Sequence, residues 1–304
     1  METLSNRRIA LRAGTYVPGT KIRPPARAAM VAAGASPQAA IVTAPFQVTY
    51  TGFSNEAKRA FQAAVDVWSL LLTTSIPIRV SAVWEPLDQG VLGQAGPSGY
   101  VRDVGGGAQA GTWYPVALAS KLASSDQAVG NPHIEASFSS SFPNWYFGTD
   151  ANTPNSKYDL MSVILHEIGH GLGFIGSMNV KTGVGSWGLG TPFPIIYDRF
   201  ARDGTGRRLL DTAQYPNNSA ALAGVLQSNQ VFFDGPQTVP ANGNAAARLY
   251  APMTWDGGSS YSHLNETIFS PGNPNSLMTP QLGLGEAIHD PGPLGLAMLH
   301  DMGW

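Results

Sequence analysis

Apolar and polar residues recur with clear periods from position 46 onward. Residues 46–51 alternate apolar with polar side chains, which is the period of a half-buried strand. Residues 55–73 place their apolar side chains on one helical face, and Ser54 or Asn55 can cap that helix. Residues 78–84 alternate again. We therefore predict a strand, a helix and a second strand in succession.

Further elements follow with weaker signals. Residues 111–118 are a weak strand candidate, and residues 133–139 are a better one because apolar and polar residues alternate along them. A long helix is predicted from about 156 to 171, where Ser156 and Asp159 have the spacing of a capping box. Together these elements predict an α+β fold.

Glycine, proline and asparagine become frequent beyond residue 174, and the periods weaken. One short helix is predicted at 219–227. A final helix is predicted at 293–302, because Pro291 precedes it and Gly303 can form a left-handed cap.

Residues 1–44 show neither the helical nor the strand period and are rich in Ala, Pro and Arg, so we expect an N-terminal extension. Arg7 and Arg8 resemble the start of a twin-arginine leader, but Gly34 and Pro37 interrupt the apolar stretch that follows. A propeptide remnant or a trimmed N-terminus fits this pattern better than an intact signal peptide.

Composition narrows the chemistry. The 304 residues include no cysteine, so disulfides, thiol nucleophiles and thiolate metal sites are excluded. Only 12% of the residues are charged, while 35 are glycine and 23 are proline. Such a loop-rich, weakly charged chain is typical of exported bacterial proteins, so we expect secretion. No run of eighteen apolar residues occurs, and we therefore expect no transmembrane helix.

The charge distribution argues against a nucleic-acid partner. The formal net charge is -2, yet residues 1–30 hold six basic side chains against Glu2 alone. The rest of the chain is therefore distinctly negative, which disfavours phosphate binding.

A short motif inside the predicted helix carries the clearest chemistry. His166, Glu167 and His170 form the pattern His-Glu-x-x-His. Residues four apart lie one turn apart on the same helical face, so the two imidazoles can bind one ion while Glu167 faces the remaining coordination position. The motif predicts a metal site with a base attached.

The glycines that follow favour this interpretation over a pair of buried core histidines. Gly171, Gly173 and Gly176 lie within six positions, and each would weaken a helix kept only for its apolar contacts. They suit a chain that must turn sharply at Gly173 and leave the helix below a metal.

A catalytic zinc ion usually takes a third protein ligand. In a compact pattern it would lie six residues after His170, but that residue is Gly176. The remaining candidates are His133, His263, His289, His300 and the carboxylate of Asp198. His263 is favoured because a polar turn, residues 257–262, precedes it.

Four segments resemble the leishmanolysin-like branch of the metzincin metallopeptidases. They are His166 to Phe174, Ser262-His263, Leu277 to Pro280 and the closing Asp301 to Trp304. The resemblance implies a metzincin-like fold with a twisted mixed sheet and a loop-rich C-terminal part. It also implies His166, His170 and His263 as zinc ligands, Glu167 as general base and Met278 beneath the metal in a methionine turn.

This chain departs from the family pattern in three ways. Leishmanolysins proper are rich in cysteine, so this chain resembles a bacterial-type relative stabilised without disulfides. Pro280 stands where some metzincins have a metal-binding tyrosine. The long spacing between His170 and His263 leaves Asp198 as an alternative third ligand.

The resemblance divides the chain into four parts. These are the extension 1–44, an N-terminal catalytic subdomain at 45–174, an inserted segment at 175–255 and a C-terminal subdomain at 256–304. The strand at 133–139 precedes the zinc helix as the family's substrate-binding edge strand does; an ordinary interior strand is the alternative.

These observations predict a secreted zinc endopeptidase, a metalloendopeptidase that acts on protein or peptide substrates as a monomer. Two alternatives remain: a non-catalytic, zinc-stabilised binding or adhesion module, and an enzyme with a non-protein substrate. Calcium is possible at Asp150, Asp256 or Asp290, but turn chemistry explains these residues more simply. We expect the aromatic residues near 113 and 145 to lie in the core, and His289 and His300 at the surface or at helix ends.

Overall fold

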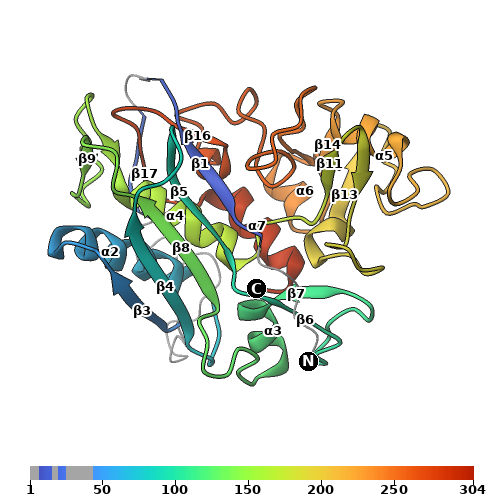
Figure 1. Cartoon of the computed structure of the whole chain (residues 1–304), viewed down its shortest axis with the longest axis horizontal. Helices are drawn as coiled ribbons and strands as arrows, with labels where there is room; N and C mark the ends of the chain where they lie inside the picture. Colours follow the sequence, from blue (N-terminus) through green and yellow to red (C-terminus); the bar gives the residue numbers. More distant parts are fainter. Residues whose placement is uncertain (1–6, 16–19, 25–43) are drawn as a thin grey trace.

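The computed structural model describes residues 7–15, 20–24 and 44–304 and shows a mixed α+β architecture (Figure 1). Its main sheet has six strands in the order β16-β1-β5-β8-β4-β3. Their bounds are β1 (Ile9–Ala13), β3 (Phe46–Thr51), β4 (Ile78–Glu85), β5 (Val91–Pro97), β8 (Ile134–Ser139) and β16 (Gln281–Leu282).

The sheet combines parallel and antiparallel pairs. Strands β3, β4 and β8 run parallel to one another, whereas β5 is antiparallel to β8. Strand β1 is antiparallel to β5 and parallel to β16. The strand predicted at 133–139 is therefore present as β8, but its expected edge position is wrong, because β5 covers one side and β4 the other.

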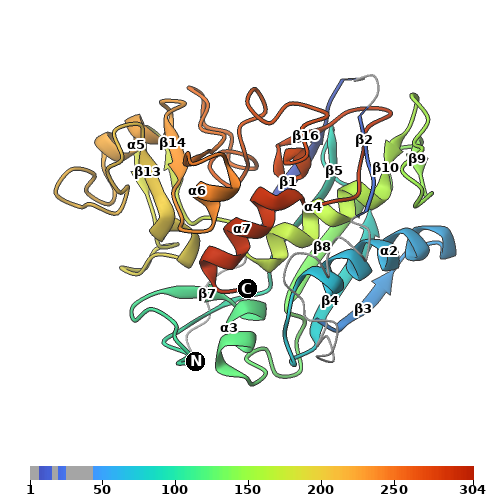
Figure 2. The ribbon, with the colours of Figure 1, turned by 180° about the vertical axis from the view of Figure 1, so that it is seen from behind.

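Helices α2 (Asn55–Leu71) and α4 (Leu160–Leu172) cover one face of the sheet, as the reverse view shows (Figure 2). Both were predicted. The indole Nε1 of Trp68 donates to the carbonyl of Leu165 at 3.0 Å and ties the two helices together. Every residue of α4 is buried.

Helix α4 begins four residues later than predicted. Asp159, not Ser156, is its N-cap, and its carboxylate accepts from the Ser162 amide at 2.7 Å. The imidazole of His289 also contacts Asp159, at 2.8 Å. His289 was expected at the surface or at a helix end; the surface alternative is wrong, because its ring is buried against the N-cap of α4.

The segment between β5 and α4 contains mostly short elements. The strand predicted at 111–118 is limited to β7, and helix α3, which was not predicted, follows at once. The aromatic side chains of Trp113, Tyr114 and Trp145 are buried, as expected. The elements are β6 (Tyr100–Arg102), β7 (Trp113–Pro115), α3 (Val116–Ala123), β9 (Trp145–Tyr146) and β10 (Tyr158–Asp159).

The segment 175–255 forms a second, smaller body of structure. A three-stranded sheet has the order β13-β14-β15, and β11 and β12 form a separate pair. The elements are β11 (Asn179–Lys181), β12 (Val184–Ser186), η1 (Ile196–Phe200), β13 (Ala201–Asp203), α5 (Ala220–Leu226), β14 (Val231–Phe233), α6 (Thr238–Ala241) and β15 (Ala247–Arg248). Helix α5 confirms the helix predicted at 219–227.

The chain ends in helix α7 (Gly292–Met302), which was predicted and is capped by Gly303 at φ 122°. The indole of Trp304 donates to the carbonyl of Leu172 at 2.7 Å, so the last residue is bonded to the end of α4. The short 3-10 helix η2 (Ser276–Met278) lies upstream.

The N-terminal stretch contains strands that the sequence pattern did not predict. Strand β1 joins the main sheet, and β2 (Lys21–Ile22) pairs with β17 (Ala287–Ile288). The extension 1–44 is thus partly integrated into the fold. Its positions Gly34 and Pro37 lie outside the described residues.

None of the helices in the described part of the chain combines the length and the apolar character needed to cross a lipid bilayer.

Gly171 allows α4 to approach the sheet closely, which gives a stability prediction. A Cβ added to Gly171 would overlap the side chain of Ile134 in β8. Gly171→Ala should therefore lower the free energy of unfolding by about 1–3 kcal/mol, despite the better helix propensity of alanine. Denaturant unfolding followed by circular dichroism measures this change.

Gly224→Ala is the matched control, because Gly224 lies on helix α5 with open space around it. This change should be neutral or stabilising by up to about 1 kcal/mol. Equal effects of both substitutions would show that contact with Ile134 does not matter.

Candidate metal centre

Helix α4 presents the first three residues of the site. His166 and His170 lie one helical turn apart, and Glu167 follows His166 directly. The helix ends at Gly173, whose φ of +126° is unfavourable for other residues. The chain turns there as predicted, and the Phe174 amide donates back to the carbonyl of Gly169 at 3.0 Å.

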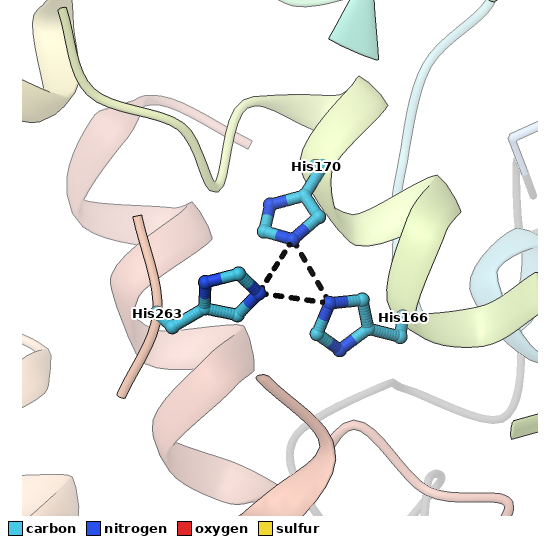
Figure 3. A group of neighbouring side chains, drawn as sticks. All are labelled: His166, His170 and His263. Atoms are coloured by element: carbon cyan, nitrogen blue, oxygen red, sulfur yellow. Dashed lines mark hydrogen bonds between the residues drawn. The ribbon is translucent and has the colours of Figure 1, made fainter. Parts of the chain in front are cut away.

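His263 comes to the same place from the far part of the chain. Its neighbours hold the backbone on both sides: Ser262 Oγ accepts from the Gly176 amide at 3.2 Å, and the Leu264 amide donates to Met278 O at 2.8 Å. Figure 3 shows the three imidazoles converging on one point. Their Nε2 atoms lie 2.9, 3.1 and 3.2 Å from one another.

The second nitrogen of each ring fixes which tautomer is present. The Nδ1 atoms of His166, His170 and His263 lie 2.6–2.7 Å from the carbonyl oxygens of Leu277, Phe174 and Ser259. A carbonyl can only accept, so each Nδ1 carries the proton. A neutral imidazole carries only one N–H, so the Nε2 atom of each neutral ring is unprotonated and has a free lone pair. Three lone pairs therefore face one another at close range.

This arrangement suits a cation with tetrahedral preference. Burial lowers the pKa of His166 and His170 well below 6.5 and that of His263 to about 4, so the rings are neutral at pH 7. Converging lone pairs repel unless a positive ion lies between them. Three nitrogens bound at 2.0–2.1 Å to one tetrahedral zinc ion would lie about 3.3 Å apart, close to the observed separations.

Glu167 is enclosed beside this cluster. It has no exposed surface, and burial raises the pKa of its carboxyl group well above 4.5, an effect opposed by the backbone amides of Leu11 and Ala95. Its Oε1 accepts from the Leu11 amide at 3.2 Å, whereas the buried Oε2 has no hydrogen-bond partner in the protein. This carboxylate oxygen, on the residue that follows His166, is therefore free to accept a hydrogen bond from a donor that the protein does not supply.

Met278 lies directly against α4. It is 2% exposed, and its Sδ would lie 2.8 Å from a Cβ placed on Gly169, the residue before His170. The preceding residue, Leu277, supplies the carbonyl that orients His166. Because Gly169, inside the His-Glu-x-x-His motif, has no side chain, η2 can approach α4 closely.

Asp198 is not part of the cluster. Its carboxylate accepts from the amides of Ser177 and Ile195 at 2.9 Å, from Tyr261 Oη at 3.0 Å and from Ser177 Oγ. Burial raises the pKa of Asp198, but four donors and no acceptor around it favour the charged form. This aspartate organises the loop before His263 and is not placed as a third ligand.

The other histidines lie elsewhere. His133 is buried and its Nε2 lies 3.2 Å from Ser120 Oγ and from Asp126, while His300 is exposed near the end of α7. His289 belongs to the network at the start of α4.

No second cluster of metal-ligating side chains is present within residues 7–15, 20–24 and 44–304. The three aspartates considered for calcium accept from nearby residues of their own turns: Asp150 from Asn152, Asp256 from Gly258 and Asp290 from Gly292.

Sequence reasoning missed the groups that orient the site. The carbonyls of Phe174, Ser259 and Leu277 leave no signature in the sequence, because any residue offers a carbonyl. The contact between Leu11 and Glu167 was equally hidden, since it joins positions 156 residues apart.

Comparison with known proteins adds one finding. A family model described as SPBPB7E8-like matches residues 49–184, which include α4 with His166, Glu167 and His170 but not His263. No curated protein matches the chain, and no solved structure matches it.

The ligand set predicts how zinc content responds to substitution. His263→Ala removes one of the three converging lone pairs, so zinc should be lost to micromolar chelator at a concentration that leaves the parent loaded. His300→Ala, at the exposed histidine, is the matched control and should keep one zinc per chain. Metal analysis after dialysis against graded chelator gives the result.

Asp198→Asn tests the alternative ligand. The amide cannot accept all four bonds, so the melting temperature should fall while zinc content stays near one per chain. Loss of zinc from Asp198→Asn together with retention by His263→Ala would transfer the third-ligand role to Asp198.

The packing of Met278 against α4 predicts that a leucine of similar shape is tolerated there and that a charged residue is not. Met278→Leu nearly conserves volume and should cost less than about 1.5 kcal/mol of stability, with zinc retained. Met278→Asp would place an anion against α4 and should lower both the melting temperature and the zinc affinity. Thermal unfolding with and without chelator separates these effects, and a tolerated aspartate would mean that Met278 does not lie against the site.

Proposed function

We propose that this protein is a zinc-dependent endopeptidase. One observation carries the proposal: three neutral imidazoles direct their lone pairs at one point, beside a buried carboxylate with a free oxygen. Three histidines and an adjacent glutamate form the ligand and base set of zinc hydrolases. A zinc ion bound there supplies Lewis-acid chemistry, because it polarises a peptide carbonyl and acidifies water.

Glu167 moves the proton in this reaction. Enclosure strengthens its carboxylate as a base, so it can accept a proton from the attacking water. The same group then returns the proton to the nitrogen of the leaving amine. A peptide nitrogen, that of Leu11, already lies 3.2 Å from its Oε1, so a main-chain amide fits within proton-transfer distance.

The proposal extends to the leishmanolysin-like metzincins as the type of peptidase. The turn at Gly173, the distant third histidine and Met278 against the zinc helix support this assignment. Secretion and a monomeric state belong to the same proposal and rest on composition and resemblance.

A zinc-stabilised binding module is the alternative. A purely structural zinc site closes its fourth position with another ligand and gains nothing from a buried carboxylate that has an unsatisfied oxygen. Glu167 therefore favours the enzyme.

Glu167→Gln tests the enzyme directly. The amide oxygen can still accept from Leu11, so the fold and zinc content should persist, whereas hydrolysis of fluorescent casein should fall by about a thousandfold or more. The exposed Glu56→Gln on α2 is the matched control and should keep full activity. In the parent, a chelator should abolish turnover and added zinc should restore it.

Near-normal turnover by Glu167→Gln would remove this residue from the mechanism. Turnover that persists in excess chelator would remove zinc from it.

A further inference from the structure

The proposed site is closed to solvent in this structure. His166, Glu167, His170 and His263 are each at most 1% exposed. Strand β1 contributes to this closure, because its Leu11 amide binds the Glu167 carboxylate. A substrate cannot reach the base while β1 is in place.

Strand β1 is held as an extended peptide would be, between two partners. On one side it pairs with β5, where Ile9 faces Ala95 and Leu11 faces Gly93. On the other side, the Arg12 and Gly14 amides donate to the carbonyls of Pro280 and Leu282 at 3.1 and 2.8 Å. Backbone pairing of this kind binds peptides with little regard to their sequence.

Glycines in β5 leave room for that backbone. A Cβ on Gly96 would overlap the carbonyl of Arg7, and one on Gly93 would lie 3.0 Å from Glu167 Cγ. At these two glycines, strand β5 therefore allows both β1 and α4 to approach it closely.

Alternate side chains of β1 and the residues before it enter the protein. Ile9 and Leu11 are buried, whereas Arg8 and Arg12 lie on the other face and pair with Glu135 and Asp256 at 2.8 and 3.4 Å. Arg7 lies on the inward side.

The guanidinium of Arg7 lies in a polar environment close enough to His170 and His263 for its charge to act on both. Its Nη1 donates to the carbonyls of Gly176 and Met178 at 2.8 and 2.9 Å, and its Nη2 is enclosed. Gly176 in turn contacts the ring of Tyr261, and the charge of Asp198 acts on Arg7. Two carbonyls and a nearby carboxylate favour a cation with several N–H donors.

We propose that the groove between β5 and β16 is a binding site for extended peptides with an arginine in the pocket of Gly176 and Met178, and that residues 7–14 are its intramolecular occupant. The proposal deepens the proposed function, because it names the feature that a substrate must carry. An arriving peptide displaces β1 and places its arginine where Arg7 lies.

The test measures binding without turnover. The probe is a fluorescent peptide with the sequence of residues 7–15, and fluorescence anisotropy is recorded on the full-length Glu167→Gln chain, with zinc and with chelator. The tethered strand competes at high effective concentration, so binding should be weak. Adding Arg7→Ala to the chain loosens the tethered strand, and the peptide should then bind about ten- to hundredfold more tightly.

Two altered peptides of equal charge supply the matched control. Replacing the first arginine by alanine should weaken binding about ten- to hundredfold, because the pocket of Gly176 and Met178 loses its donor. Replacing the second arginine should weaken binding much less, because the corresponding Arg8 forms only a partly exposed ion pair with Glu135 and a 3.2 Å hydrogen bond to Ser137 Oγ. Equal losses from both peptides would overturn the arginine pocket.

Hydrogen exchange of α4 reports whether the Arg7→Ala chain stays folded, and exchange of the Leu11 amide reports how far β1 has loosened; if α4 opens, Arg7→Lys replaces Arg7→Ala. A folded chain of either kind that fails to bind the peptide overturns the proposal. The chain could bind the peptide with arginine selectivity and yet never hydrolyse casein, even as the Arg7→Ala chain with Glu167 intact. That outcome would overturn only the proposed peptidase activity. Casein hydrolysis without arginine selectivity overturns the pocket alone.

Discussion

Three lone pairs that face one another within 3.2 Å are the constraint on which the site depends. Each imidazole is held in this position by a hydrogen bond from Nδ1 to a backbone carbonyl. Those carbonyls belong to three separate loops or short helices, around 174, 259 and 277. A cation bound between the rings would relieve their mutual repulsion, so in the proposed function the loops that hold the rings also provide the affinity for the metal.

Close approach replaces covalent cross-links in holding these segments together. With no cysteine in the chain, α4 is tied to its neighbours by two indole N–H groups, those of Trp68 and Trp304. The absence of a Cβ at Gly169 and Gly171 lets Met278 and Ile134 reach the helix backbone. A low content of charge is consistent with such a structure, because apolar contact and backbone hydrogen bonding provide its cohesion.

The closed state of the site connects strand β1 with the proposed function. In the proposed function, the enclosed Glu167 carboxylate with its orphaned oxygen is the base, but no substrate can reach it while the site is closed. The peptide-like position of β1 reconciles these two facts, because the same backbone bonds that seal the groove can be offered to another chain. Closure of the site by β1 and binding of another peptide then use the same backbone donors and acceptors.

The local pattern alone predicted the strands at 46–51 and 78–84, the existence of helices α2 and α4 though not the start of α4, and the pairing of His166 with His170 across one helical turn. These features depend on residues close in sequence, whose side-chain periods are visible directly. The third histidine was favoured by its turn, but only the tertiary structure brought it to the cluster and placed Asp198 outside. The interior position of β8, the glycine-rich strand β5 and the entry of β1 into the sheet were decided by pairing between distant segments. Such pairing leaves no period in one sequence, because its hydrogen bonds use backbone groups that every residue shares.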